Sequence, residues 1–67
     1  MRFVLSFDMD NDAFNGPDNA ADEVIRILHA TAARVDDVAR MGFEVIGGYV
    51  RDSNGNRIGE WEVTEDA

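Results

Sequence analysis

Three aspartates follow the N-terminal apolar run of this chain, and their spacing could support metal or phosphate chemistry. In the stretch FVLSFDMDND they are Asp8, Asp10 and Asp12. These would be positions 1, 3 and 5 of a calcium-binding loop, where carboxylates are the usual ligands. The loop pattern then fails, because position 6 is Ala13 instead of glycine and position 12 is Asn19 instead of glutamate. Weak cation binding stays an alternative, but the sequence predicts no dedicated metal site.

The same stretch resembles the nucleophile loop of haloacid dehalogenase-like phosphotransferases, in which a buried strand delivers two aspartates as Asp-x-Asp. The resemblance would make Asp8 the nucleophile and Asp10 the general acid and base. However, Asp12 stands where that family has a small or β-branched residue, and the family's core needs well over twice these 67 residues. The chain also contains no lysine, which such phosphoryl transfer uses. We therefore predict no catalytic activity and no cofactor.

Composition excludes cysteine chemistry and histidine clusters. The chain has no cysteine and a single histidine, His29, so it can form neither a disulfide framework nor a thiolate or histidine metal site. The lack of disulfides fits a reducing compartment. The sequence also shows no secretory signal and no apolar stretch of membrane-spanning length. We expect a cytoplasmic protein.

The chain is strongly acidic, with 14 aspartates and glutamates against 6 arginines and a formal net charge of −8. Phosphate contacts need a basic patch, so direct binding to nucleic acid is disfavoured. Binding to an anionic membrane is disfavoured for the same reason. The charge favours a protein partner with a basic surface. Solubility alone is the alternative explanation for the excess of acids.

Six carboxylates gather in sixteen residues, from position 8 to position 23, that contain no basic residue. Because these like charges repel one another, their retention without nearby cations suggests a use in binding. Carboxylates spaced like duplex phosphates can occupy the basic groove of a nucleic-acid enzyme, which is the physical basis of DNA mimicry. We predict that a partner binds the cluster formed by Asp8, Asp10, Asp12, Asp18, Asp22 and Glu23.

A strand, a loop and a helix must position these acids. Residues 2–7 alternate between the two faces with a period of two, the pattern of a half-buried strand. Asp, Asn and Gly dominate residues 8–16, which predicts a loop. A helix is predicted over about 18–41, because Pro17 suits its first turn and Gly42 suits the left-handed position that ends a helix.

The predicted helix is amphipathic. On its outer face, i,i+4 ion pairs are expected between Asp22 and Arg26 and between Asp36 and Arg40. Its apolar residues follow helical spacing, with seven on one face and two on the flank. The face comprises Ala21, Val24, Ile25, Leu28, Ala32, Val35 and Ala39, and the flank comprises Ile27 and Val38.

Two runs rich in β-branched and aromatic residues, 43–51 and 57–63, predict a β-hairpin. The segment between them contains Asn54 and Gly55, a pair that suits a type I′ turn because both central positions need positive φ. The sequence leaves open whether the loop has two or three residues. The choice shifts the register by one residue, and with it the face that carries Tyr49.

Together the elements predict an α+β fold, a single β-α-β-β domain over residues 1–67 in which 64–67 form a frayed acidic tail. A right-handed crossover gives a three-stranded antiparallel sheet of order 1-3-2 with one long helix packed on one face. Val4 and later apolar residues that point away from the helix would be exposed, so a homodimer through the sheet face is one expectation. The predicted core comprises Leu5, Phe7, Val24, Leu28, Val35, Val45 and Trp61.

Three segments together resemble small acidic proteins of tailed phages and prophages. They are DNDAF (10–14), ILHATAARV (27–35) and DSNGNRIGEW (52–61). The resemblance implies a phage setting in the host-cell cytoplasm and no established activity. Small acidic phage proteins as a class are frequently inhibitors of host defence or DNA-repair enzymes. The resemblance favours a non-enzymatic inhibitor that occupies the nucleic-acid-binding site of such an enzyme, with a self-associating structural or accessory phage protein as the alternative.

Overall fold

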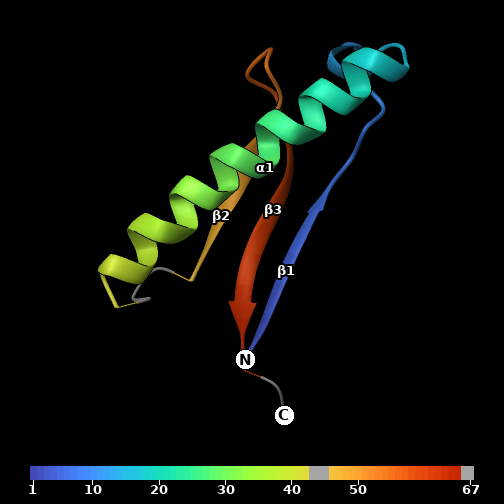
Figure 1. Cartoon of the computed structure of the whole chain (residues 1–67). Helices are drawn as coiled ribbons and strands as arrows, with labels where there is room; N and C mark the ends of the chain where they lie inside the picture. The colour runs from blue at the N-terminus through green and yellow to red at the C-terminus, as the bar shows by residue number, and fades with distance from the viewer. Residues whose placement is uncertain (43–45, 66–67) are drawn as a thin grey trace.

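The structure is a computed structural model of the chain and describes residues 1–42 and 46–65. Three strands form an antiparallel sheet in the order β1-β3-β2, and one long helix lies across one face of it (Figure 1). The predicted α+β fold and the predicted strand order are therefore confirmed. In chain order the elements are β1 (Arg2–Phe7), the short 3-10 helix η1 (Asp12–Phe14), α1 (Pro17–Arg40), β2 (Gly47–Arg51) and β3 (Arg57–Thr64).

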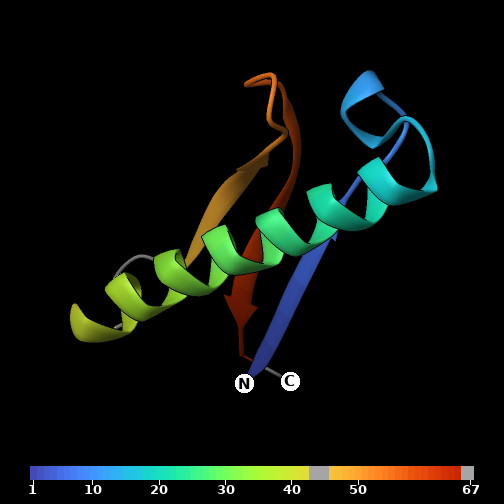
Figure 2. The same ribbon diagram turned by 45° about the horizontal axis from the view of Figure 1, so that its top comes forward.

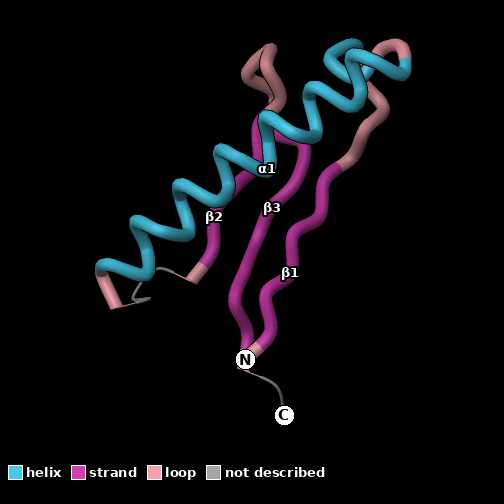
Figure 3. Tube along the Cα trace, viewed as in Figure 1, coloured by secondary structure: helices cyan, strands magenta, loops and turns pink. Residues whose placement is uncertain are grey.

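β3 is the central strand, and its register with both neighbours decides which side chains face α1. Trp61 lies opposite Leu5 of β1 and Gly48 of β2. Directly opposed side chains share a face of the sheet, and the tube view shows the three strands side by side beneath α1 (Figure 3). Thr64, predicted to begin the frayed tail, instead pairs with Arg2 and ends β3. Residues 66–67 lie outside the described part of the chain.

The core lies between α1 and the sheet. Trp61 and Ile27 are its most buried large side chains, with 2% and 1% of their surface exposed. The Trp61 ring stacks on Phe3 with centroids 5.9 Å apart. The indole fits over β2 because Gly48 has no Cβ, and an added Cβ would lie 2.7 Å from the indole Nε1. The buried apolar residues are Phe14, Ile27, Val38, Val50, Trp61 and Val63.

The buried stripe of α1 is not the face that the apolar spacing predicted. Leu28, predicted in the core, is 47% exposed, and Ile25 is 52% exposed. Ile27 and Val38, predicted on the flank, are buried, and so is Thr31. The helix crosses the strands at a slant (Figure 2), and its main strand contacts are with β2. The stripe of α1 that faces β2 includes the polar residues Glu23 and Thr31. A count of apolar residues alone therefore predicted the wrong buried face.

Most of the other core predictions agree with the structure. Trp61 is buried, and four more predicted core residues are partly buried against the core: Leu5, Phe7, Val24 and Val35. Val45 lies outside the described residues.

Five residues separate β2 from β3, and the outer two, Asp52 and Asn56, are hydrogen-bonded to each other, so the loop itself has three residues. The N–H of Asp52 donates to the carbonyl of Asn56 at 2.9 Å, and the N–H of Gly55 donates to the carbonyl of Asp52 at 3.0 Å. Gly55 has φ +85°, so a left-handed glycine closes the loop. The structure therefore decides the open choice against a two-residue turn centred on Asn54 and Gly55. The β2–β3 register shifts between Val50 and the following residue.

The sheet face away from α1 exposes less apolar surface than the sequence predicted. Val50 faces α1 and is 4% exposed, whereas Tyr49 points to the outer face and is 60% exposed. The Arg57 guanidinium lies 3.6 Å from the centroid of the Tyr49 ring. Ile58 packs against the core, and Val4 is 38% exposed. A homodimer through that face stays a prediction from the sequence.

Candidate protein-binding surface

The segment between β1 and α1 carries the first three acids and is held by specific contacts. The N–H of Asp8 donates to the backbone of β3 at 3.0 Å, which continues the ladder past the end of β1. The Asn11 side chain accepts a hydrogen bond from the N–H of Ala13 at 3.2 Å and so caps η1. Phe14 at the end of η1 is buried, and its ring stacks on Phe7 with centroids 6.2 Å apart. Sequence reasoning missed Phe14 as a core residue.

The start of α1 carries the next two acids. Pro17 is the first helical residue and follows Gly16, which has φ +85° and offers no side-chain cap. Asp18 therefore lies in a first turn whose free N–H groups and positive dipole end favour an anion. Asp22 follows one turn later and is exposed.

Among the described residues, the ion pairs join Arg26 to Glu23 and Arg40 to Asp36. The predicted pair between Arg40 and Asp36 is confirmed at 3.2 Å, whereas the predicted pair between Arg26 and Asp22 is wrong. Five of the six predicted acids are exposed, and within the described chain none of them forms an ion pair. We call these five the exposed acidic cluster: Asp8, Asp10, Asp12, Asp18 and Asp22.

Glu23, the sixth predicted member, is not part of this surface because it is 5% exposed. Its Oε1 accepts from Arg26 Nε at 2.6 Å, and its Oε2 accepts from the N–H and the hydroxyl of Ser53, both at 2.8 Å. Glu23 therefore fastens α1 to the hairpin loop. No local sequence signal could reveal this contact, since Ser53 lies 30 residues further along the chain.

A second buried carboxylate, Asp52, organises the hairpin loop and is 3% exposed. Its Oδ1 accepts from the N–H groups of Asn54 at 2.9 Å and Asn56 at 2.8 Å. Its Oδ2 accepts from the side-chain amides of Asn56 and Asn11. The contact with Asn11 ties the β1–α1 loop to the hairpin. An aspartate at the head of a turn is a recognised signal for the local bonds, but the contact with Asn11 is tertiary.

Both buried carboxylates stay ionised to low pH. The hydrogen bond from Arg26 lowers the pKa of Glu23 from 4.5 to about 2, against the opposing effect of burial, and Ser53 acts in the same direction as Arg26. Burial raises the pKa of Asp52, but hydrogen bonds led by those from Asn56 outweigh it and hold the pKa below 3.8. Protonation of either carboxylate would therefore weaken the hydrogen bonds that hold the loops together.

We expect Glu23 to make the fold sensitive to acid. Its pKa is lower in the folded chain, about 2, than the ordinary value of 4.5. The stabilisation is therefore fully present above the unfolded pKa and is lost as the pH falls from about 4.5 to about 2. Urea unfolding followed by circular dichroism from neutral pH to about pH 3 should show this loss in the wild type.

The Glu23→Gln variant identifies the group responsible. It should be less stable at neutral pH by about 1–3 kcal/mol, because it weakens the buried contacts with Arg26 and Ser53. Its stability should fall less between pH 5 and pH 3 than that of the wild type. Glu62→Gln, at an exposed position on the outer sheet face, is the matched control and should keep the wild-type slope. An unchanged slope in Glu23→Gln would contradict the assignment.

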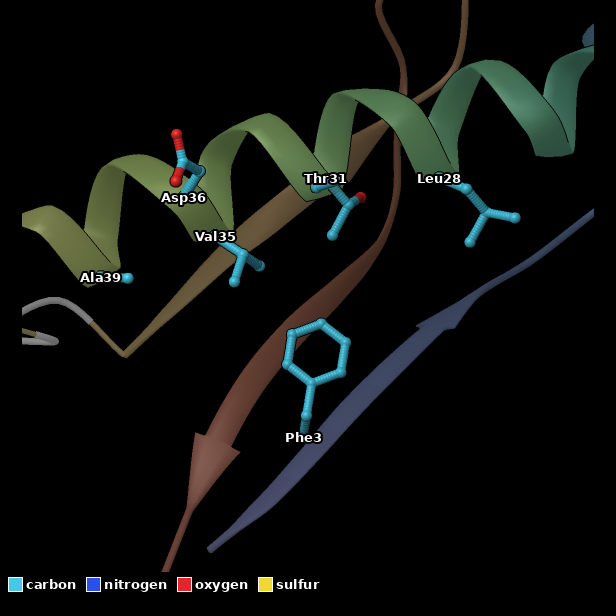
Figure 4. A pocket seen from close by; sticks show the side chains of 7 residues that line it. Phe3, Leu28, Thr31, Val35, Asp36 and Ala39 are labelled. Atoms are coloured by element: carbon cyan, nitrogen blue, oxygen red, sulfur yellow. The ribbon is translucent and has the colours of Figure 1, made fainter.

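A second surface feature is an apolar groove of about 560 Å³ between α1 and β1. The close view shows Phe3 projecting from β1 toward the gap below Leu28 and Val35 (Figure 4). The groove stays open because α1 makes its main strand contacts with β2, at the opposite edge of the sheet. We call it the α1–β1 groove, and it is lined by Phe3, Leu28, Thr31, Ala32, Val35, Asp36 and Ala39.

The described residues show no arrangement of metal ligands. Within residues 1–42 and 46–65, no three His, Cys, Asp or Glu side chains are grouped so that they could hold an ion. The aspartates after β1 are thus not brought together as ligands. None of the helices in the described part of the chain combines the length and the apolar character that a bilayer span requires.

No family model, no curated protein and no solved structure matches this chain. The likeness to acidic phage proteins stays a prediction from sequence segments.

Proposed function

We propose that this chain is a non-catalytic, cytoplasmic binding protein that docks its exposed acidic cluster on a basic protein surface. The carrying observation is that five exposed carboxylates surround one end of the fold without an ion-pair partner among the described residues. A surface of one sign attracts a basic partner and steers its approach. The basic surface that we propose is the nucleic-acid-binding site of a host defence or DNA-repair enzyme, and a phage origin belongs to the same proposal.

Two arginines near this end, Arg26 and Arg51, are engaged elsewhere, which supports the proposal. Arg26 binds Glu23 and also donates through Nη2 to the carbonyl of Arg51 at 3.0 Å. Arg51 in turn donates through Nη1 to the carbonyl of Gly55 at 3.1 Å. Both guanidinium groups are therefore held against the helix and the hairpin, and neither neutralises the exposed acidic cluster.

The segments that carry the acids are ordered before any partner arrives. Phe14 anchors η1 in the core, and the bond from Asn11 to Asp52 fastens the loop to the hairpin. Binding therefore requires little further ordering of the loop, and loop ordering is a common cost of association.

Reversing two charges of the cluster should remove partner binding without unfolding the protein. The test variant carries Asp10→Lys and Asp22→Lys, and the matched control carries Asp37→Lys near the other end of α1 and Glu62→Lys on the outer sheet face. Both variants change the net charge equally, and all four side chains are exposed. In pull-downs from bacterial lysate, the wild type and the control should retain a basic nucleic-acid-binding protein. The test variant should retain it at least about tenfold less well.

Two further measurements distinguish binding at a nucleic-acid-binding site from attraction by bulk charge. Raising the salt to about 0.5 M, where the Debye length is about 4 Å, should weaken retention. Duplex DNA should displace the retained protein if both occupy one site. Retention that resists DNA contradicts the nucleic-acid-site proposal, and equal loss in both variants means that bulk charge does the binding. Asp8 is left unchanged because it borders the same hollow as Arg57.

A further inference from the structure

β1 is an edge strand, and no described strand pairs with its outer side. The N–H of Asp8 donates to β3, and alternate residues of an antiparallel strand turn their backbone groups the same way. Val4 and Ser6 therefore also face β3. The close approach of Phe7 to Gly59 agrees with this, since the residues of a non-hydrogen-bonded pair lie nearest each other. The backbone groups that point away from the sheet are those of Phe3, Leu5 and Phe7.

Exposed apolar side chains lie along this open edge. Phe3 on β1 is 49% exposed, and Leu28 on α1, which lines the same groove, is 47% exposed. The α1–β1 groove runs between them (Figure 4). β1 itself contains no acidic residue, in a chain that has 14. An open strand edge beside an apolar groove is a typical site of protein association.

We propose that a second copy of this chain pairs with this edge, β1 to β1 in antiparallel orientation, with the two Leu5 residues opposite each other. In that register Phe3 of each copy lies opposite Phe7 of the other. The outward backbone groups of both strands then meet as hydrogen-bonded pairs. A slip by one residue would set the apolar side chains of one copy on the polar face of the other.

Charge complementarity identifies the second copy as the occupant. Arg2 is the only charged residue of β1, and Asp8 follows its other end. The register centred on Leu5 sets Arg2 of each copy opposite Asp8 of the other. Opposite charges facing each other across strands are stabilising, whereas like charges are destabilising. The edge of one copy therefore presents the charges that the edge of a second copy needs. A strand from another protein would have to present the same two charges at the same spacing.

The twofold symmetry of this dimer also brings the α1–β1 grooves of the two copies together. The twofold axis runs perpendicular to the sheet between the two Leu5 residues, so both α1 helices lie on the same face of one six-stranded sheet. Each α1–β1 groove then opens toward the other copy, with Phe3 and Leu28 on the inner side. The pairing uses Asp8 of the exposed acidic cluster but not Asp10 or Asp22, so the test of the dimer and the test of the proposed function change different residues and can fail separately.

Sedimentation velocity tests the proposal directly. Between low micromolar and near-millimolar concentration, the 7.4 kDa chain should shift to twice that mass. Because each copy has a formal charge of −8, salt should strengthen the dimer by screening the repulsion between copies. Salt should act in the opposite direction on the binding of a basic partner to the exposed acidic cluster.

Charge swaps test the register. Arg2→Asp and Asp8→Arg each set like charges opposite one another, so each should weaken the dimer about tenfold. They change the net charge in opposite directions, so bulk charge cannot explain a loss in both. The double variant restores the opposed pairs and the wild-type net charge, and dimerisation should return. An equimolar mixture of the two single variants should form mixed dimers for the same reason.

Amide hydrogen exchange provides a readout at individual residues. The amides of Phe3, Leu5 and Phe7 should become protected as concentration rises, while those of Val4 and Ser6 are protected already by β3. Thermal melts at low concentration check that each variant folds. A chain that is monomeric at every concentration would overturn the proposal and leave the edge to another protein. The proposal would also be overturned if the charge swaps left dimerisation unchanged, or if dimerisation protected amides other than those of Phe3, Leu5 and Phe7.

Discussion

Gly59→Ala should unfold most of the protein by separating β1 from β3. Gly59 lies opposite Phe7 in the ladder. A Cβ added there would lie 2.6 Å from the Phe7 Cα and would overlap the carbonyl oxygen of Ser6. These are backbone atoms, so no side-chain rotation relieves the clash. We expect a loss of about 3 kcal/mol or more, which approaches the whole stability of about 3–5 kcal/mol that so small a core supplies.

Gly42→Ala is the matched control for this prediction. Gly42 has φ +76°, and its missing Cβ would meet nothing within 4 Å. The substitution therefore costs only the left-handed strain of a non-glycine residue, about 1–2 kcal/mol. Urea unfolding followed by far-ultraviolet circular dichroism compares the two variants, and exchange of the β1 amides shows whether the strand detaches. Equal stability losses in the two variants would contradict the close approach of β1 at Gly59.

Ile27→Ala should cost about 2–5 kcal/mol, whereas Leu28→Ala, one residue later on the same helix, should cost less than about 1 kcal/mol. Ile27 is 1% exposed and lies in the core, so its truncation leaves a cavity. Leu28 is 47% exposed, and alanine is the better helix former. The two substitutions thus measure which face of α1 is buried.

The measurement requires low protein concentration, so that self-association does not contribute to stability. Thermal and urea unfolding of both variants under these conditions give the two free energies of unfolding. Similar losses, or a larger loss in Leu28→Ala, would return α1 to the orientation that its apolar spacing predicted. At high concentration Leu28→Ala should in addition weaken the dimer, because the proposed pairing covers Leu28.

The strands and the chain order were predictable because their signals are local. The alternation of β1 and the glycine in the hairpin loop constrain the backbone within a few residues. The orientation of α1 was not predictable in the same way. Ile27 and Leu28 are both apolar neighbours, and only the slant of the helix over β2 decides which one is buried.

The residues of the candidate site likewise include some that local sequence signals predicted correctly and one that they did not. The acids Asp10, Asp12 and Asp22 were predicted to be available to a partner, and the structure places them exposed. Glu23 belongs to the same stretch of sequence, yet the fold buries it against Ser53. A charge count cannot separate these cases, because a buried carboxylate and an exposed one have the same local sequence signal.

The amino-acid sequence by itself determined the β-α-β-β order, the acidic character of the β1–α1 segment and the absence of cysteine chemistry. Each follows from composition or from spacing over a few residues. Only the tertiary structure decided the burial of Glu23 and Asp52 and the opening of the α1–β1 groove. These features depend on contacts between residues far apart in the chain. Such contacts are set by how the helix lies on the sheet, which no local pattern encodes.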